Sequence, residues 1–148
     1  MRLVAGVRTH LLALPAISAL VSTRIFELIA PEKVTPPYVV LMRVSDPSLD
    51  SHLRGPGFLS RARLQVDCWA KTPDAASALG TLCRQRLDAF AGVWSSGGSP
   101  VETITVQGIR QDDERDIFEE EILGGICRHS ADYFVTYRPS GEEILAFV

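Results

Sequence analysis

The sequence predicts an α+β fold, a mostly antiparallel sheet with one long helix packed on one face and an N-terminal helix. Several short segments alternate apolar and polar residues, which is the pattern of a half-buried strand. One segment near the middle of the chain carries a single apolar stripe at helical spacing. A helix between two groups of antiparallel strands is typical of a sheet that carries its helices on one face.

The N-terminal part of the chain is predicted to begin with a helix. Apolar residues recur at helical spacing over Leu3–Leu14. Pro15 suits the first position of a second short helical turn, Pro15–Val21, and the residue before a proline disfavours helix, so we expect a break there. A small strand over Arg24–Ile29 and a β-rich strand over Tyr38–Val44 are expected to follow.

The clearest alternation in the chain lies within Phe58–Ala70. One set of alternate residues is apolar: Ala62, Leu64, Val66 and Cys68. The other set is Arg61, Arg63, Gln65, Asp67 and Trp69. This pattern predicts a strand with one buried face and one polar face that carries an aromatic side chain.

The best helix signal follows this strand. Thr72 can accept a hydrogen bond as the N-cap, and Pro73 suits the first helical position. An apolar stripe then continues to Phe90, with Gly92 as a plausible stop. We therefore expect one long amphipathic helix from Pro73 to Phe90.

The rest of the chain is predicted to add two strands. After a linker at Ser95–Pro100, the segment Val101–Arg110 alternates again. Gln111–Gly125 is acidic and irregular in pattern, and Ile126–Arg138 is expected to form the final strand. We assign residues 1–138 to one α+β domain and residues 139–148 to a C-terminal extension.

Composition argues for an ordinary globular domain. The chain has 148 residues, of which 46% are hydrophobic and 22% charged, close to globular averages. A net charge of -3 with scattered arginines does not indicate a nucleic-acid binder. No apolar run reaches membrane-spanning length, so no membrane partner is expected. The cysteines Cys68, Cys83 and Cys127 are expected to be reduced thiols, because their count is odd and their spacings are wide.

No catalytic, cofactor-binding or metal-binding residues are expected, and the chain is interpreted as a non-enzyme. The histidines His10, His52 and His129 lie in no nucleophile motif. The acidic run between residues 112 and 121 lacks the ligand spacing of a calcium loop. Gly55-Pro56-Gly57 lacks the lysine and the helix of a phosphate-binding loop.

Candidate contacts between subunits come from two charged groups. Arg54, Arg61 and Arg63 are either ordinary surface charge or partners of the acidic segment of a neighbouring copy. Trp69 either packs beneath a loop or anchors an interface. The residues selected as candidate contacts are Arg54, Arg61, Arg63, Trp69, Asp112, Asp113, Glu114, Glu119 and Glu120.

Several of these segments, taken in order, resemble one family. The segments are Leu20–Phe26, Pro37–Val40, Arg61–Ala70, Val106–Ile109, Asp112–Asp116 and Asp132–Arg138. Their order and spacing, from about Leu11 to Arg138, resemble the tail completion family of long-tailed phages, which includes tail terminators and tail-to-head joining proteins.

The resemblance implies a structural virion protein. It implies a ring of identical copies, expected to number six, that caps the tail tube and contacts the head–tail connector or stopper protein. DNA would pass through the lumen of the ring without specific binding. The ring would be assembled in the bacterial cytoplasm and lie at the head–tail junction of a phage, a prophage product or a gene transfer agent. No catalytic residue is carried over.

Three other functions stay open at this point. A neighbouring stopper or adaptor ring protein would share most of these features. A tail-tube subunit would polymerise into long tubes by itself. A small enzyme would need a pocket with convergent polar groups and a perturbed titrating residue.

Overall fold

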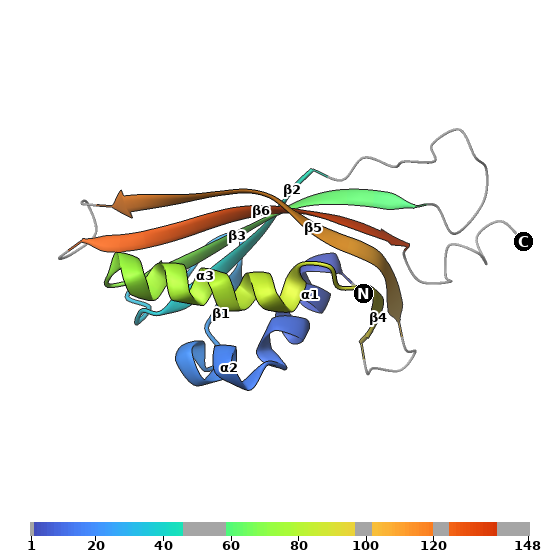
Figure 1. The fold of residues 1–148 in the computed structure, drawn as a ribbon. Helices are drawn as coiled ribbons and strands as arrows, with labels where there is room; N and C mark the ends of the chain where they lie inside the picture. The colour runs from blue at the N-terminus through green and yellow to red at the C-terminus, as the bar shows by residue number, and fades with distance from the viewer. Residues whose placement is uncertain (1, 46–58, 97–101, 120–124, 139–148) are drawn as a thin grey trace, which may run out of the picture.

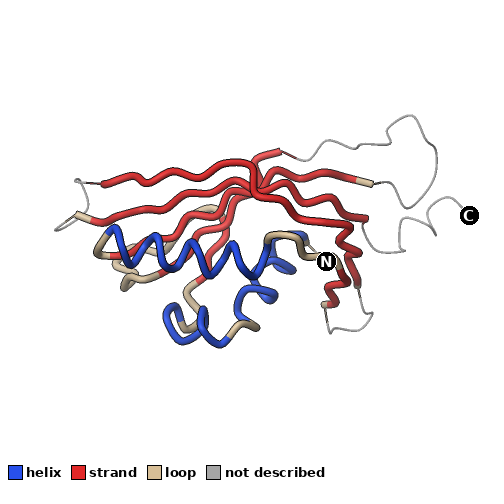
Figure 2. The backbone as a smooth tube through the Cα atoms, in the orientation of Figure 1, coloured by secondary structure: helices blue, strands red, loops and turns tan. Residues whose placement is uncertain are grey.

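The computed structural model describes residues 2–45, 59–96, 102–119 and 125–138. Within these residues the chain forms three helices and a six-stranded sheet (Figures 1 and 2). The elements are α1 (Leu3–Leu12), α2 (Pro15–Val21), β1 (Ile25–Glu27), β2 (Tyr38–Ser45), β3 (Ser60–Ala70), α3 (Pro73–Leu87), β4 (Gly92–Ser95), β5 (Thr103–Glu119) and β6 (Ile126–Arg138).

The sheet has the strand order β1-β2-β3-β6-β5-β4. β1 pairs with β2 in parallel, and the other neighbouring strands pair antiparallel. The predicted mixture of helices and strands is confirmed. The helical layer is richer than expected, because all three helices lie on one side of the sheet (Figure 1). The predicted break at Pro15 separates α1 from α2, which are bent by 97° relative to each other.

The core lies between the sheet and the helices. The apolar residues of β3 are buried as their alternation predicts, with Leu64 fully buried. Leu79 and Leu87 of α3 belong to the same buried cluster as these strand residues. Cys68 and Cys83 also belong to it, as free thiols with their Sγ atoms 3.9 Å apart. Their hydrogen bond and their burial raise the pKa of Cys68 well above its ordinary value, so this thiol stays protonated.

α3 begins as the sequence predicts and ends earlier. The hydroxyl oxygen of Thr72 accepts a hydrogen bond from the Ala75 amide (3.1 Å), and Pro73 takes the first helical position. The prediction that the helix reaches Phe90 is wrong, because the helix ends at Leu87. The backbone turns away at Ala89, where φ is 65°, and this turn places the Phe90 ring against the His10 ring instead.

Replacing Thr72 with alanine should lower the free energy of unfolding by about 1 kcal/mol, because the Ala75 amide loses its side-chain acceptor. Urea unfolding followed by circular dichroism measures the change. Thr72→Ser keeps the hydroxyl and should stay close to the parent protein. Equal losses in the two variants would contradict the capping role.

Two strand predictions are corrected by the structure. Gly92–Ser95, expected to be a helix stop and the start of a linker, forms β4 and pairs with Thr103–Val106. Gln111–Glu119, expected to be irregular, continues β5 along β6. The register shifts between Val106 and Gly108 and again between Gln111 and Asp113. Each shift breaks the period of two, so simple alternation cannot follow the strand through these points.

His10 joins α1 to the end of α3. Its Nε2 lies 3.0 Å from the Arg86 carbonyl oxygen, and Arg86 Nε donates to the His10 carbonyl oxygen at 2.9 Å. The His10 ring also packs against Phe90, with ring centroids 4.1 Å apart. Burial lowers the pKa of His10 from its ordinary value of 6.5. The folded state therefore favours the neutral imidazole.

The burial of neutral His10 predicts that the free energy of unfolding falls on mild acidification. Because the folded-state pKa lies below 6.5, the stabilisation is present above pH 6.5 and is lost as the pH falls through the folded-state pKa. We expect thermal unfolding of the parent protein to shift downward between pH 7.5 and pH 5.5 more than that of His10→Gln. Parallel pH profiles for the two proteins would contradict this role of His10.

Candidate functional site

The sheet face opposite the helices, called the open face here, carries most of the candidate contact residues. Its residues come from alternate positions of β3 and β6 and from the middle of β5, brought together by the pairing of these three strands. They are Arg61, Arg63, Gln65, Asp67 and Trp69 of β3, Asp113 and Arg115 of β5, and Arg128, Ser130, Asp132 and Phe134 of β6. No described helix covers this face (Figure 1).

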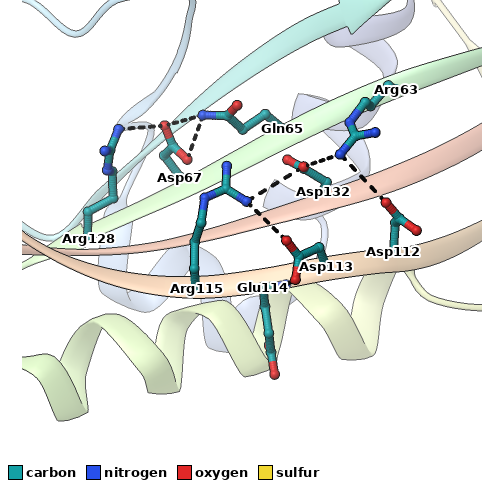
Figure 3. Close-up of polar contacts among 9 residues, drawn as sticks. All are labelled: Arg63, Gln65, Asp67, Asp112, Asp113, Glu114, Arg115, Arg128 and Asp132. Atoms are coloured by element: carbon teal, nitrogen blue, oxygen red, sulfur yellow. Dashed lines mark hydrogen bonds and ion pairs between the residues drawn. The ribbon is translucent and has the colours of Figure 1, made fainter.

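A buried carboxylate holds the centre of the open face. Asp132 is 5% exposed, and its Oδ2 lies 2.8 Å from Arg63 Nη2 and 3.6 Å from Arg115 Nη1 (Figure 3). Arg63 also reaches Asp112 at 3.6 Å, and Arg115 reaches Asp113 at 3.7 Å. A carboxylate this buried needs a compensating charge, which the two arginines supply from the neighbouring strands.

A second polar group lies further along β3. Both carboxylate oxygens of Asp67 accept hydrogen bonds from Gln65 Nε2, at 3.1 and 3.0 Å, and Oδ2 lies 3.5 Å from Arg128 Nη1 (Figure 3). The Arg128 guanidinium also lies 5.1 Å from the centre of the Trp69 ring. Trp69 in turn stacks on Tyr38, with ring centroids 5.8 Å apart. Charged and aromatic side chains therefore share this part of the open face.

A shallow hollow lies at the other end of the open face. Its volume is about 410 Å³, and Arg61, Arg110 and Phe134 are among its lining residues. The Arg61 guanidinium lies 4.9 Å from the centre of the Phe134 ring, which is a cation–π geometry.

Glu114 and Asp116 lie on the helix side of β5, apart from this network. Figure 3 shows the Glu114 side chain directed away from the arginine–aspartate network. His129 is 6% exposed, and its Nδ1 lies 2.8 Å from Asp116 Oδ1 and its Nε2 3.4 Å from Glu114 Oε2. The acidic segment is thus divided between the two faces of the sheet.

The structure describes the side chains of six of the nine selected residues. Arg61, Arg63, Trp69 and Asp113 lie on the open face, Asp112 approaches Arg63, and Glu114 contacts His129. Glu119 ends β5, and Arg54 and Glu120 lie outside the described residues. Arg63 pairs with acids of its own chain, so its contact with a neighbouring copy stays a prediction. Asp132 and Arg115 were not selected, because sequence alone does not show which strands are neighbours.

The part of the chain that the structure describes contains no cluster of three or more histidine, cysteine or acidic side chains that could hold a metal ion. Of the histidines, His10 binds a backbone carbonyl and His129 contacts carboxylates. His52 lies outside the described residues. Among the described helices none is by itself long and apolar enough to cross a membrane, although α1 and α2 taken together across their bend meet that test of length and composition.

The sequence matches the family described as Tail completion protein gp17 over residues 5–125. The chain belongs to this family. It is therefore a structural tail protein of the phage type, and it is located in the virion. The suspected relationship to tail completion proteins is thereby confirmed.

A solved structure supports the fold of this tail completion protein. A chain in the structure described as the virion of a native gene transfer agent (GTA) particle is similar over 92% of this chain and 94% of that chain. The TM-score is 0.69 and the sequence identity is 17%, so the similarity establishes a shared fold. A comparison with curated proteins finds no match.

Proposed function

We propose that this tail completion protein is a tail terminator, a ring of copies that caps the tail tube and joins it to the head connector. The family match over residues 5–125 carries the proposal. The resemblance described above puts the number of copies at six. In this role the protein is not an enzyme, and DNA passes through the ring without specific binding.

The two edges of the sheet favour a head-to-tail contact between copies. At one edge, Asp112–Glu119 of β5 pairs with β6, and no other described strand pairs with it. This edge is rich in acidic side chains. The opposite edge holds the short β1, followed by Leu28 and Ile29, which are 60% and 79% exposed. Unlike surfaces on one molecule make heterologous contacts, and these contacts generate a ring when the rotation closes.

The open face supplies further candidate contacts. Arg61, Arg63 and Trp69 are proposed to contact a neighbouring copy or an adjoining ring, together with the acids of residues 112–120. Exposed ion pairs contribute only about 0–1 kcal/mol each, so these charges would determine the register of a contact more than its strength. The arrangement of 1–138 as one domain with 139–148 as an extension is part of the same proposal.

The test is assembly with tail tubes in vitro. The purified protein is imaged by negative-stain electron microscopy alone and after mixing with tail-tube subunits. A terminator should form single rings alone and should shorten the tubes as its concentration rises. Self-assembly into long tubes would identify a tube subunit instead, and rings that leave the length of the tubes unchanged would favour a stopper or adaptor. Either outcome would overturn the proposal.

A further inference from the structure

A large hollow in the described part of the chain lies outside the arginine–aspartate network. It is found at the end of the sheet where β3 ends and β2 and β6 begin, and its volume is about 830 Å³. Its walls are largely apolar, with Val34, Pro36, Tyr38 and Ile126 among the lining residues. Tyr38, Val40 and Ile126 form a small buried cluster beside it, separate from the main core. An apolar hollow of this size on a tail protein is a candidate docking surface.

The rim of this hollow carries both lysines of the chain. Both lysines of the sequence, Lys33 and Lys71, line it, and both are exposed. Neither forms an ion pair with another described residue. An occupant with apolar side chains and adjacent carboxylates would therefore match both the walls and the rim.

Residues 139–148 have this chemistry. Their sequence is Pro-Ser-Gly-Glu-Glu-Ile-Leu-Ala-Phe-Val, in which Glu142 and Glu143 are followed by apolar residues. Removal of these apolar side chains from water lowers the free energy of the system, so it favours docking in an apolar hollow. The two glutamates would lie opposite the two lysines if the apolar residues entered the hollow.

Chain length decides between a contact within one copy and a contact between copies. The hollow includes Ile126 at the start of β6, and the segment follows Arg138 at the end of β6. Twelve residue steps along a strand correspond to about 40 Å. Phe147 follows Arg138 by nine residues, which span at most about 32 Å when fully extended. Even if fully extended back along β6, the backbone of Phe147 would therefore stop about 8 Å short of Ile126 of its own chain, which favours a contact between copies.

We propose that Glu142–Val148 of one copy docks in this hollow of a neighbouring copy, with its apolar side chains on Tyr38 and Ile126 and its glutamates at Lys33 and Lys71. The inference rests on the proposed ring, because the ring supplies the neighbouring copy. The docked segment would link successive subunits across their contact.

Cysteine cross-linking in the full-length protein tests the proposal. Val34→Cys lies in the hollow, and Phe147→Cys lies in the docking segment. After oxidation with diamide, the double variant should give a ladder of covalent oligomers on non-reducing gels. The matched control combines Phe147→Cys with Ala78→Cys, an exposed position on α3, and should stay largely monomeric.

Charge reversal provides a second measurement on the same cysteine pair. Lys33→Glu with Lys71→Glu should lower the cross-linked fraction roughly fivefold, as the loss of two exposed ion pairs would. Adding Glu142→Lys and Glu143→Lys should restore it. If the only product is a monomer with a disulfide within one chain, the proposal is overturned. If both introduced thiols stay free, it is also overturned, because the hollow would then hold another occupant. Rings that persist without the ladder would refute the docking and leave the terminator function standing.

Discussion

Replacing Tyr133 with alanine is expected to lower the free energy of unfolding by about 3–5 kcal/mol. Tyr133 is 1% exposed, and it lies in the main core between the sheet and α3. The buried ring packs against the core on all sides, so its truncation to alanine leaves a cavity beneath the helix. Chemical unfolding followed by circular dichroism measures the loss, which is a large share of the 5–15 kcal/mol typical of a folded domain.

The adjacent residue on the same strand provides the control. Phe134 lies on the open face, under the Arg61 and Arg63 guanidinium groups. Phe134→Ala removes a ring of similar size but should cost only about 1 kcal/mol, because it loses a partly exposed cation–π contact. Equal costs for Tyr133→Ala and Phe134→Ala would contradict the assignment of the two faces of β6.

Replacing Gly80 with alanine is expected to destabilise the protein by about 1–3 kcal/mol, although alanine is the better helix former. A Cβ atom at Gly80 would lie 2.7 Å from His129 Nε2 and closer still to the ring carbon Cδ2. The ring cannot easily move aside, because Asp116 binds its Nδ1 at 2.8 Å. α3 must therefore shift away from the sheet. Thermal unfolding measures the effect.

The same substitution should reverse sign when His129 is removed. In a His129→Ala background the ring no longer blocks the new methyl group. Gly80→Ala should then raise the free energy of unfolding by up to about 1 kcal/mol through helix propensity. Destabilisation of the same size in both backgrounds would show that His129 is not the obstacle.

Local patterns predicted the elements whose reasons are local. The alternation of β3 identified its buried face, and Thr72-Pro73 located the start of α3. The proline at position 15 separated the first two helices. Each of these depends on residues within a few positions of one another, which periodicity and capping rules describe well.

The features that were missed depend on distant partners. β4 is short and gains its strand character from pairing with β5. The length of β5 was missed because two register shifts interrupt its alternation. The pairing of Arg63 with Asp132, 69 positions away in sequence, was not predicted, because the sequence offered only surface charge or the acidic segment of a neighbouring copy for Arg63. Predicting such pairs requires knowledge of which strands are neighbours. Predicting the hollow lined by Lys33 and Lys71 requires the same knowledge.

The arginine–aspartate network changes how the charged residues are interpreted. Arg63 and Arg115 compensate Asp132 within the chain, so much of their charge is already used in the folded subunit. We therefore expect contacts with a partner at the hollow lined by Arg61 and Phe134, at the β5 edge, and at the apolar hollow lined by Lys33 and Lys71. Substitutions at these three surfaces should impair assembly while the fold stays intact.

Imaging of the assembled particle tests the central claim most directly. Cryo-electron microscopy of intact particles should reveal this fold as a ring of six copies between the end of the tail tube and the head connector. A single copy at that place, or density for this fold anywhere else in the particle, would contradict the account.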